Sequence, residues 1–107
     1  MKLNILGSEW NVEFHRKHED KEFFDNAADG WTDYSRKLIA LLDKSDMDEG
    51  IDKEQYQKKV FRHELIHAFL MESGLFESCD WHCEEMVDWF AFQSPKIYRV
   101  FQELDLL

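Results

Sequence analysis

The stretch with the clearest potential for chemistry is residues 58–74, KKVFRHELIHAFLMESG, in which His63, Glu64 and His67 form an HExxH motif. On an α-helix, residues four positions apart lie one turn apart on the same face, so both imidazoles can reach one metal ion. Glu64 follows the first histidine by about 100° around the helix, where its carboxylate can take a proton from a water molecule. The motif therefore predicts a zinc site with one ion per chain, in preference to two ordinary core histidines.

Catalytic zinc usually has three protein ligands and an open position for water, so a third ligand is expected outside the motif. Glu72 lies too near on the same helix to approach the ion from another side. Glu84 begins the pattern EEMVD, in which Asp88 follows one helical turn later. A liganding carboxylate at that spacing would allow Asp88 to orient a histidine ligand through its outer ring nitrogen. The other downstream candidates are acidic, sulfur or imidazole side chains: Glu77, Cys79, His82, Cys83 and Glu85.

The helix that must carry the motif has recognisable ends. Asp52 is a candidate N-cap, and Gln55 stands three residues later, as in a capping box. Gly74 supplies a C-terminal stop. Apolar residues recur between these ends at a spacing of three to four: Tyr56, Val60, Phe61, Leu65, Phe69 and Leu70. This pattern predicts an α-helix over about residues 53–73, with the motif in its middle.

Short strands are expected before this helix. Residues 3–14 alternate apolar and polar around Gly7-Ser8, which predicts a β-hairpin. Residues 31–42 predict a second pair of strands, the last of them Lys37 to Leu42. The charged segment 15–30 between the two pairs is interpreted as a polar connection, with His15 and His18 exposed to solvent. The first half of the chain therefore predicts a small sheet of three or four strands.

The residues after Gly74 predict helices. Ser78 or Asp80 can cap a helix whose apolar surface includes Val87 and Phe90. Pro95 marks either the end of that helix or a kink, and an amphipathic last helix follows. Strands come first and helices after, which is the order of an α+β fold.

Composition limits the function classes. With 107 residues, of which 44% are hydrophobic and 15% aromatic, the chain is expected to form a single globular domain, residues 1–107. A net charge of −10 argues against direct binding of nucleic-acid phosphates. No apolar run approaches a membrane span, and the N-terminus leads into no signal-peptide core. Cys79 and Cys83, four residues apart, suit no common disulfide, so we expect an intracellular, cytoplasmic protein.

The order HExxH and then ExxxD on the next helix, here Glu84 to Asp88, resembles the gluzincin metallopeptidases, the class that includes thermolysin. The chain also resembles the very small zincins of phages and prophages, close to the ImmA/IrrE-type metallopeptidases. In those proteins the third ligand lies six residues before a Phe-Ala pair, and Phe90-Ala91 again selects Glu84. The resemblance covers residues 58–92 well and the preceding strands loosely.

The resemblance implies a minimal zincin-like fold and a role for each residue of the motifs. It assigns zinc ligation to His63, His67 and Glu84, general base and acid function to Glu64, and orientation of a histidine ligand to Asp88. It further implies a phage-encoded protein acting in the host cytoplasm on a peptide or protein substrate.

The chain departs from the thermolysin pattern at two points. Cys83 stands where the thermolysin motif has asparagine before the ligand glutamate. No residue matches the further histidine or tyrosine that stabilises the oxyanion in larger gluzincins, and the candidates are Tyr34, His82 and Tyr98. Zincins bind substrate along an edge strand before the active-site helix, so the resemblance gives that place to Lys37–Leu42.

The function predicted is a zinc-dependent metallopeptidase in which Glu64 activates a zinc-bound water that attacks the peptide bond. The alternative is a non-catalytic, zinc-stabilised acidic binding protein, for example a phage-encoded inhibitor or a mimic of DNA charge that engages a host protein. A second, separate zinc site formed by Cys79, His82 and Cys83 is also conceivable, although no second cysteine pair completes it.

Overall fold

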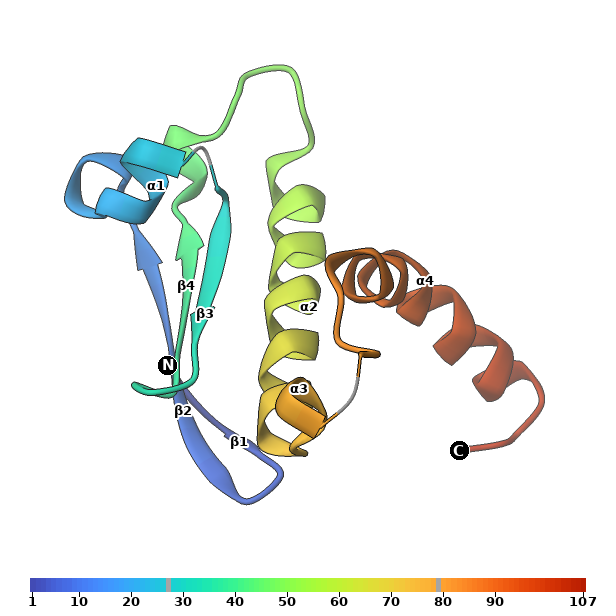
Figure 1. The fold of residues 1–107 in the computed structure, drawn as a ribbon. Helices are drawn as coiled ribbons and strands as arrows, with labels where there is room; N and C mark the ends of the chain where they lie inside the picture. Colours follow the sequence, from blue (N-terminus) through green and yellow to red (C-terminus); the bar gives the residue numbers. More distant parts are fainter. Residues whose placement is uncertain (27, 79) are drawn as a thin grey trace.

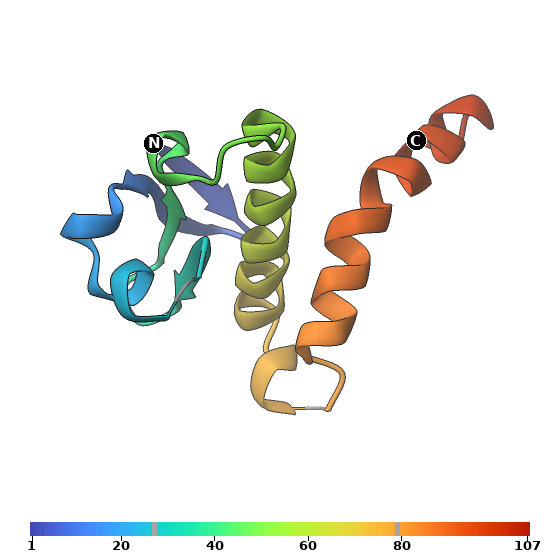
Figure 2. The same ribbon diagram turned by 90° about the horizontal axis from the view of Figure 1, so that it is seen from above.

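In the computed structural model, which describes residues 1–26, 28–78 and 80–107, a four-stranded sheet precedes two long helices in an α+β arrangement. The strands are β1 (Lys2–Ile5), β2 (Ser8–His15), β3 (Gly30–Asp33) and β4 (Leu38–Leu42). The sheet, α2 (Lys53–Glu72) and α4 (Glu84–Glu103) lie side by side in that order, with α2 in the middle (Figures 1 and 2). The predicted fold class is confirmed.

The strand order is β1-β2-β4-β3. β1 and β2 form the predicted antiparallel hairpin, and β3 and β4 form the second one. The two hairpins join through a parallel pairing of β2 with β4, in which Val12 lies opposite Ile39. β4 is therefore central, so the expectation that Lys37–Leu42 is an edge strand is wrong. β3 is the edge strand that lies beside α2 (Figure 1).

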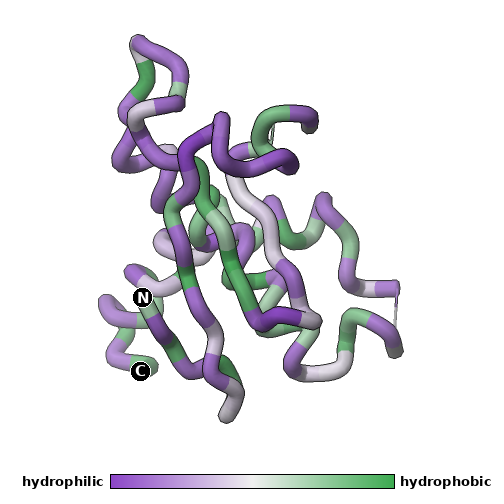
Figure 3. Tube along the Cα trace, turned by 90° about the vertical axis from the view of Figure 1, so that its left-hand side faces the viewer, coloured by the Kyte–Doolittle hydropathy of each residue, from purple (hydrophilic) through white to green (hydrophobic). Residues whose placement is uncertain are grey.

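β4 is buried along its whole length because both faces of the sheet are covered there. Successive side chains of a strand point to opposite faces. Ile39 and Leu41 belong to the core under α2, whereas Ala40 and Leu42 pack with Phe23 of the short helix α1 (Lys21–Asn26). A strand buried on both faces has a continuous apolar sequence, and LIALL is the hydrophobic run in the centre of the sheet in Figure 3.

The segment 15–30 is more structured than a polar connection. It contains a 3₁₀ turn at Lys17–Glu19 and α1, and its first residue, His15, ends β2. Both ring nitrogens of His15 face carboxylates, with Nδ1 2.6 Å from Asp20 and Nε2 2.8 Å from Glu13. The prediction that His15 is exposed to solvent is wrong, because it lies on the sheet and not in the loop. A second 3₁₀ turn, Lys44–Asp46, follows β4.

Helix α2 begins where the capping box predicted. The Asp52 side chain accepts a hydrogen bond from the backbone N–H of Gln55 at 3.1 Å. The helix runs for 20 residues and ends at Glu72, with Gly74 adopting a positive φ of 82° just beyond it. Its apolar face packs on the sheet through residues that include Val60, Phe61, Leu65 and Ala68.

The sequence left open whether Pro95 ends a helix or kinks it, and the structure shows that no separate last helix begins there. A short helix, α3, spans Leu75–Ser78, and α4 then runs unbroken through Pro95. The N-cap of α4 is Cys83, so a helix start at Ser78 or Asp80 is wrong. Pro95 cannot donate to the Ala91 carbonyl four residues earlier, and Arg62 of α2 supplies that bond instead, with Nε 2.6 Å from the carbonyl oxygen. The proline therefore coincides with a contact between the helices.

Helix α4 packs on α2 through its N-terminal half, where Val87 and Ala91 are buried. Its C-terminal half extends away from the rest of the molecule, with Val100, Phe101 and Leu104 exposed (Figure 2). None of the described helices combines the length and apolar character needed to span a bilayer.

Candidate metal centre

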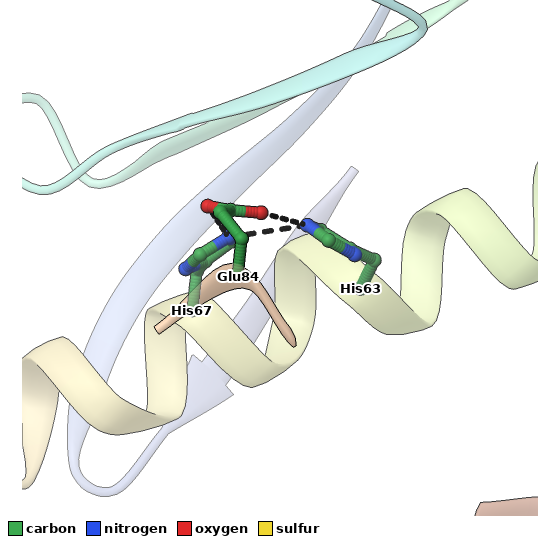
Figure 4. A group of neighbouring side chains, drawn as sticks. All are labelled: His63, His67 and Glu84. Atoms are coloured by element: carbon green, nitrogen blue, oxygen red, sulfur yellow. Dashed lines mark hydrogen bonds and ion pairs between the residues drawn. The ribbon is translucent and has the colours of Figure 1, made fainter. Parts of the chain in front are cut away.

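Two histidines of α2 and the first residue of α4 converge on one point (Figure 4). The Nε2 atoms of His63 and His67 lie 3.2 Å apart. Glu84 places one carboxylate oxygen 3.0 Å from each of them, Oε2 beside His63 and Oε1 beside His67. Within the described part of the chain these three residues form the one group of metal-ligating side chains with its ligand atoms within 4.8 Å of one another. The arrangement can hold a metal ion.

The separations fit a small tetrahedral ion. Zinc bonds to histidine nitrogen and carboxylate oxygen are about 2.0–2.2 Å long, which puts neighbouring ligand atoms about 3.4 Å apart at the tetrahedral angle. The 3.2 Å distance between the two Nε2 atoms is close to that value, and each Glu84 carboxylate oxygen lies 3.0 Å from one of these nitrogens. All three side chains project from the two helices, and the strands lie on the other side of the group (Figure 4).

Asp88 lies where the ExxxD spacing places it. One turn after Glu84 on α4, its carboxylate oxygen is 3.0 Å from Nδ1 of His63. Such a contact fixes the ring of a liganding histidine and leaves Nε2 for the metal. Both carboxylates are open to solvent, with 74% of the Glu84 side chain and 62% of the Asp88 side chain exposed.

Glu64 is buried beside this group and points toward the sheet. The Thr32 hydroxyl of β3 donates to Oε1 of Glu64 at 2.8 Å. Burial raises the pKa of the Glu64 carboxyl, and the Thr32 hydrogen bond only partly opposes that rise. A carboxylate with increased proton affinity at the edge of a metal site is suited to accept a proton from water.

Gly30 permits the close approach of β3 to α2. A Cβ atom at this position would lie 2.7 Å from Cγ1 of Val60 and 3.1 Å from Cγ of Glu64. Any side chain there would push the strand from the helix or displace Glu64. The sequence indicated only that Gly30 ends a loop, whereas in the structure it is the first residue of the edge strand.

His82, which precedes α4, contacts the second histidine of the motif. Its Nε2 lies 2.6 Å from Nδ1 of His67, and its ring packs edge-on against Phe76 with centroids 4.8 Å apart. Burial lowers the pKa of both His67 and His82, so both rings favour the neutral form. A neutral His67 is what a metal ligand requires.

A cavity of about 450 Å³ opens beside the converging side chains. Its walls combine the candidate ligands with residues of the edge strand and an apolar margin. They are formed by Gly30, Trp31, Thr32, His63, Glu64, His67, Met71, Phe76, His82 and Glu84. The cavity has room for several residues of an extended peptide.

The remaining candidates lie elsewhere. Of the three considered for oxyanion stabilisation, only His82 lines the cavity. Tyr34 lies in the β3–β4 turn with Lys37 Nζ over its ring, and Tyr98 is exposed on the outer half of α4. Cys83 is an exposed free thiol at the start of α4. Cys79 lies outside the described residues, and with it the proposed separate site of two cysteines and His82.

Thr32 and the His67–His82 contact were not found from the sequence. Threonine is common in strands, and nothing in its neighbourhood marks Thr32 as the partner of a carboxylate 32 residues later. His82 stood among several candidate ligands, and its spacing from His67 does not indicate a contact. Comparison of the chain with protein-family models, with curated proteins and with solved structures gives no match.

Proposed function

We propose that this protein is a zinc-dependent metallopeptidase. The observation that carries the proposal is the convergence of His63, His67 and Glu84 on one point with the buried carboxylate of Glu64 beside it. This is the arrangement implied by the resemblance to gluzincins and small phage zincins, and we infer the same origin and a cytoplasmic setting. The exposed free thiol of Cys83 agrees with a reducing compartment.

Zinc is the metal that best suits the donors. Two imidazole nitrogens and one carboxylate form the His₂Glu set of catalytic zinc, and the 3.2 Å separation of the two Nε2 atoms suits its tetrahedral geometry. When bound, zinc supplies Lewis-acid polarisation of the substrate carbonyl and a lowered pKa for water. His63 and His67 would hold it from α2, and Glu84 from α4.

Glu64 would move the proton. Its burial and its single described polar partner, Thr32, keep the carboxyl from being strongly stabilised as the anion. The carboxylate would accept a proton from water as the peptide carbonyl is attacked, and would then donate it to the leaving amine. Asp88 would keep the His63 ring in place through the Nδ1 contact.

The substrate would be a peptide or a protein segment in extended form. Zincins pair such segments with an edge strand, and in this chain the edge strand beside the site is β3, not β4. Trp31 and Thr32 of β3 line the cavity together with the metal-binding residues. Backbone groups on the outer edge of Gly30–Asp33 would therefore bind the substrate. The net charge of −10 favours neutral or basic partners over nucleic acid.

The test measures bound zinc and hydrolysis in parallel. The wild type should retain one zinc per chain after dialysis and cleave members of a broad peptide library, and a chelator should abolish the cleavage. Glu84→Ala should lose the metal, because two histidines alone hold zinc weakly. Glu85→Ala is the matched control: adjacent helical residues point about 100° apart, so it should keep both zinc and activity.

Loss of zinc from Glu85→Ala instead of Glu84→Ala would overturn the ligand assignment. Retention of zinc without cleavage of any peptide would overturn the peptidase and support the zinc-stabilised acidic binding protein. A wild-type chain that binds no zinc would overturn both.

A further inference from the structure

His82 has an unusual combination of contacts. Its Nε2 lies 2.6 Å from Nδ1 of His67, on the side of the His67 ring that faces away from Glu84. Its own Nδ1 is buried and has no hydrogen-bond partner among the described residues. A buried polar atom without a partner costs stability. A contribution to folding stability therefore does not explain why a histidine occupies position 82.

The proposed metal ligation determines the tautomers of the two rings, since each ring nitrogen can either donate or accept a hydrogen bond. Nε2 of His67 faces Nε2 of His63 and the Glu84 carboxylate, and it must be free of a proton to bind a metal. The proton of neutral His67 is then on Nδ1, which donates to Nε2 of His82. His82 accepts only if its own proton is on Nδ1, and this is the buried atom without a described partner.

We propose that His82 is a positioning residue for the metal site, which acts by accepting the Nδ1–H of His67. The contact holds His67 in the tautomer and ring orientation that leave Nε2 available. His82 thus does for His67 what Asp88 does for His63, but with a neutral, partly buried acceptor in place of an exposed carboxylate. The inference rests on the proposed metal site.

Neighbouring side chains restrict the His82 ring to this role. Phe76 packs against it edge-on, at a centroid distance of 4.8 Å, and the ring lies tilted against His67 with centroids 4.9 Å apart. The unpaired Nδ1 of His82 lowers the stability of the fold. Its Nε2 accepts the hydrogen bond from His67, and substitutions can separate the two effects.

Two variants separate them. His82→Gln can still present an oxygen to Nδ1 of His67, whereas His82→Leu fills similar space and cannot accept a hydrogen bond. We expect His82→Leu to bind zinc about 10- to 100-fold more weakly in a competition titration, as losses of such outer contacts commonly do. His82→Gln should stay within a few-fold of the wild type. His18→Leu, at an exposed histidine outside the site, is the control and should change nothing.

Thermal unfolding of the metal-free variants distinguishes positioning from a structural role. His82→Leu removes the unpaired buried Nδ1 of His82 but also removes the acceptor of the His67 Nδ1–H, so the two effects on stability oppose one another. The variant should therefore unfold close to the wild-type temperature while it binds zinc more weakly. A lower unfolding temperature in parallel with weaker binding in both variants would mean that His82 is merely structural, and the proposal would fall. It would also fall if His82→Leu bound zinc as tightly as the wild type.

The tautomer can be observed without metal. Long-range proton–nitrogen NMR correlations of the metal-free protein should show His67 with its proton on Nδ1 in the wild type and in His82→Gln, and a mixture of tautomers in His82→Leu. A wild type that binds no zinc but shows this pattern would refute the metallopeptidase and leave the contact established. A wild type with the proton on Nε2 of His67 would refute the positioning role.

Discussion

Helix α2 carries two glutamates that reach back to the sheet, and their surroundings are opposite. Glu72, near its C-terminal end, has three partners: Lys37 Nζ at 2.5 Å, Trp10 Nε1 at 2.8 Å and Ser8 Oγ at 3.0 Å. Glu64, two turns earlier, has the Thr32 hydroxyl at 2.8 Å and otherwise mainly its own burial. The hydrogen bond from Lys37 holds the pKa of Glu72 below its usual range, whereas burial raises the pKa of Glu64.

The difference shows how one helix uses the same residue type for two purposes. Glu72 is stabilised as an anion and ties the end of the helix to β2 and to the β3–β4 turn, a structural role. Glu64 is left with few partners in a buried place, which costs stability but preserves its capacity to take a proton. Of these two glutamates, the one that the fold stabilises less as an anion is the one beside the candidate metal ligands.

The largest effect that can test this contrast is on catalysis. Glu64→Gln keeps the shape of the side chain but cannot accept a proton, so hydrolysis by the zinc-loaded protein should fall by about 10²- to 10⁴-fold. Zinc content should remain at one per chain, because Glu64 is not one of the three proposed ligands. Glu72→Gln, measured alongside, should cleave at close to the wild-type rate. Loss of zinc from Glu64→Gln would make Glu64 a ligand and remove the contrast.

The next effect is on stability and has a defined pH dependence. Because the folded-state pKa of Glu72 is lowered from its ordinary 4.5, its contribution is complete above that value and is lost as pH falls through the lowered pKa. Glu72→Gln should therefore melt several degrees below the wild type at pH 7, and the gap should shrink as the pH is taken below 4.5. Thermal unfolding of the metal-free proteins from pH 7 to 3 measures it. A gap that stays constant with pH would show that the Glu72 charge contributes nothing.

The smallest effect concerns the one hydroxyl that Glu64 retains. The Thr32 hydrogen bond opposes the rise in the pKa of Glu64, so Thr32→Val should raise this pKa further. The acidic limb of the pH–rate profile should move to higher pH, and the rate at neutral pH should fall a few-fold. Thr32→Ser retains the hydroxyl and should keep the wild-type profile. If Thr32→Ser and Thr32→Val shift the pH–rate profile equally, the hydroxyl is not the cause of the shift.

Features that depend on neighbouring residues in the chain could be predicted from the sequence. The cap at Asp52, the apolar spacing and Gly74 define α2 to within a residue, because each acts within a few positions of itself. The same local logic placed Asp88 beside His63, since both the HExxH and ExxxD spacings are helical repeats. The pairing of the two strands within each hairpin is equally local.

Features that depend on the assembly of distant segments could not be predicted. β4 became central through its parallel pairing with β2, and alternation of side chains does not reveal which strand will be a neighbour. Helix α1 has a charged sequence in which Phe23 is the buried anchor, too little for a periodic pattern. The partners of Glu64 and His67 come from β3 and from the segment before α4. Neither sequence separation corresponds to a helical or strand repeat.

The contact between Pro95, Ala91 and Arg62 has a consequence for register. Carbonyl groups inside a helix normally accept the N–H four residues later, and only the one that faces a proline lacks this donor. Arg62, one residue before His63, bonds to that carbonyl. If α4 slid along α2 by one turn, about 5.4 Å, Arg62 would lose this acceptor and Glu84 would leave His67 at the same time. An interruption of one hydrogen-bond ladder thus selects a single alignment of the two helices, the one in which residues from both can share an ion.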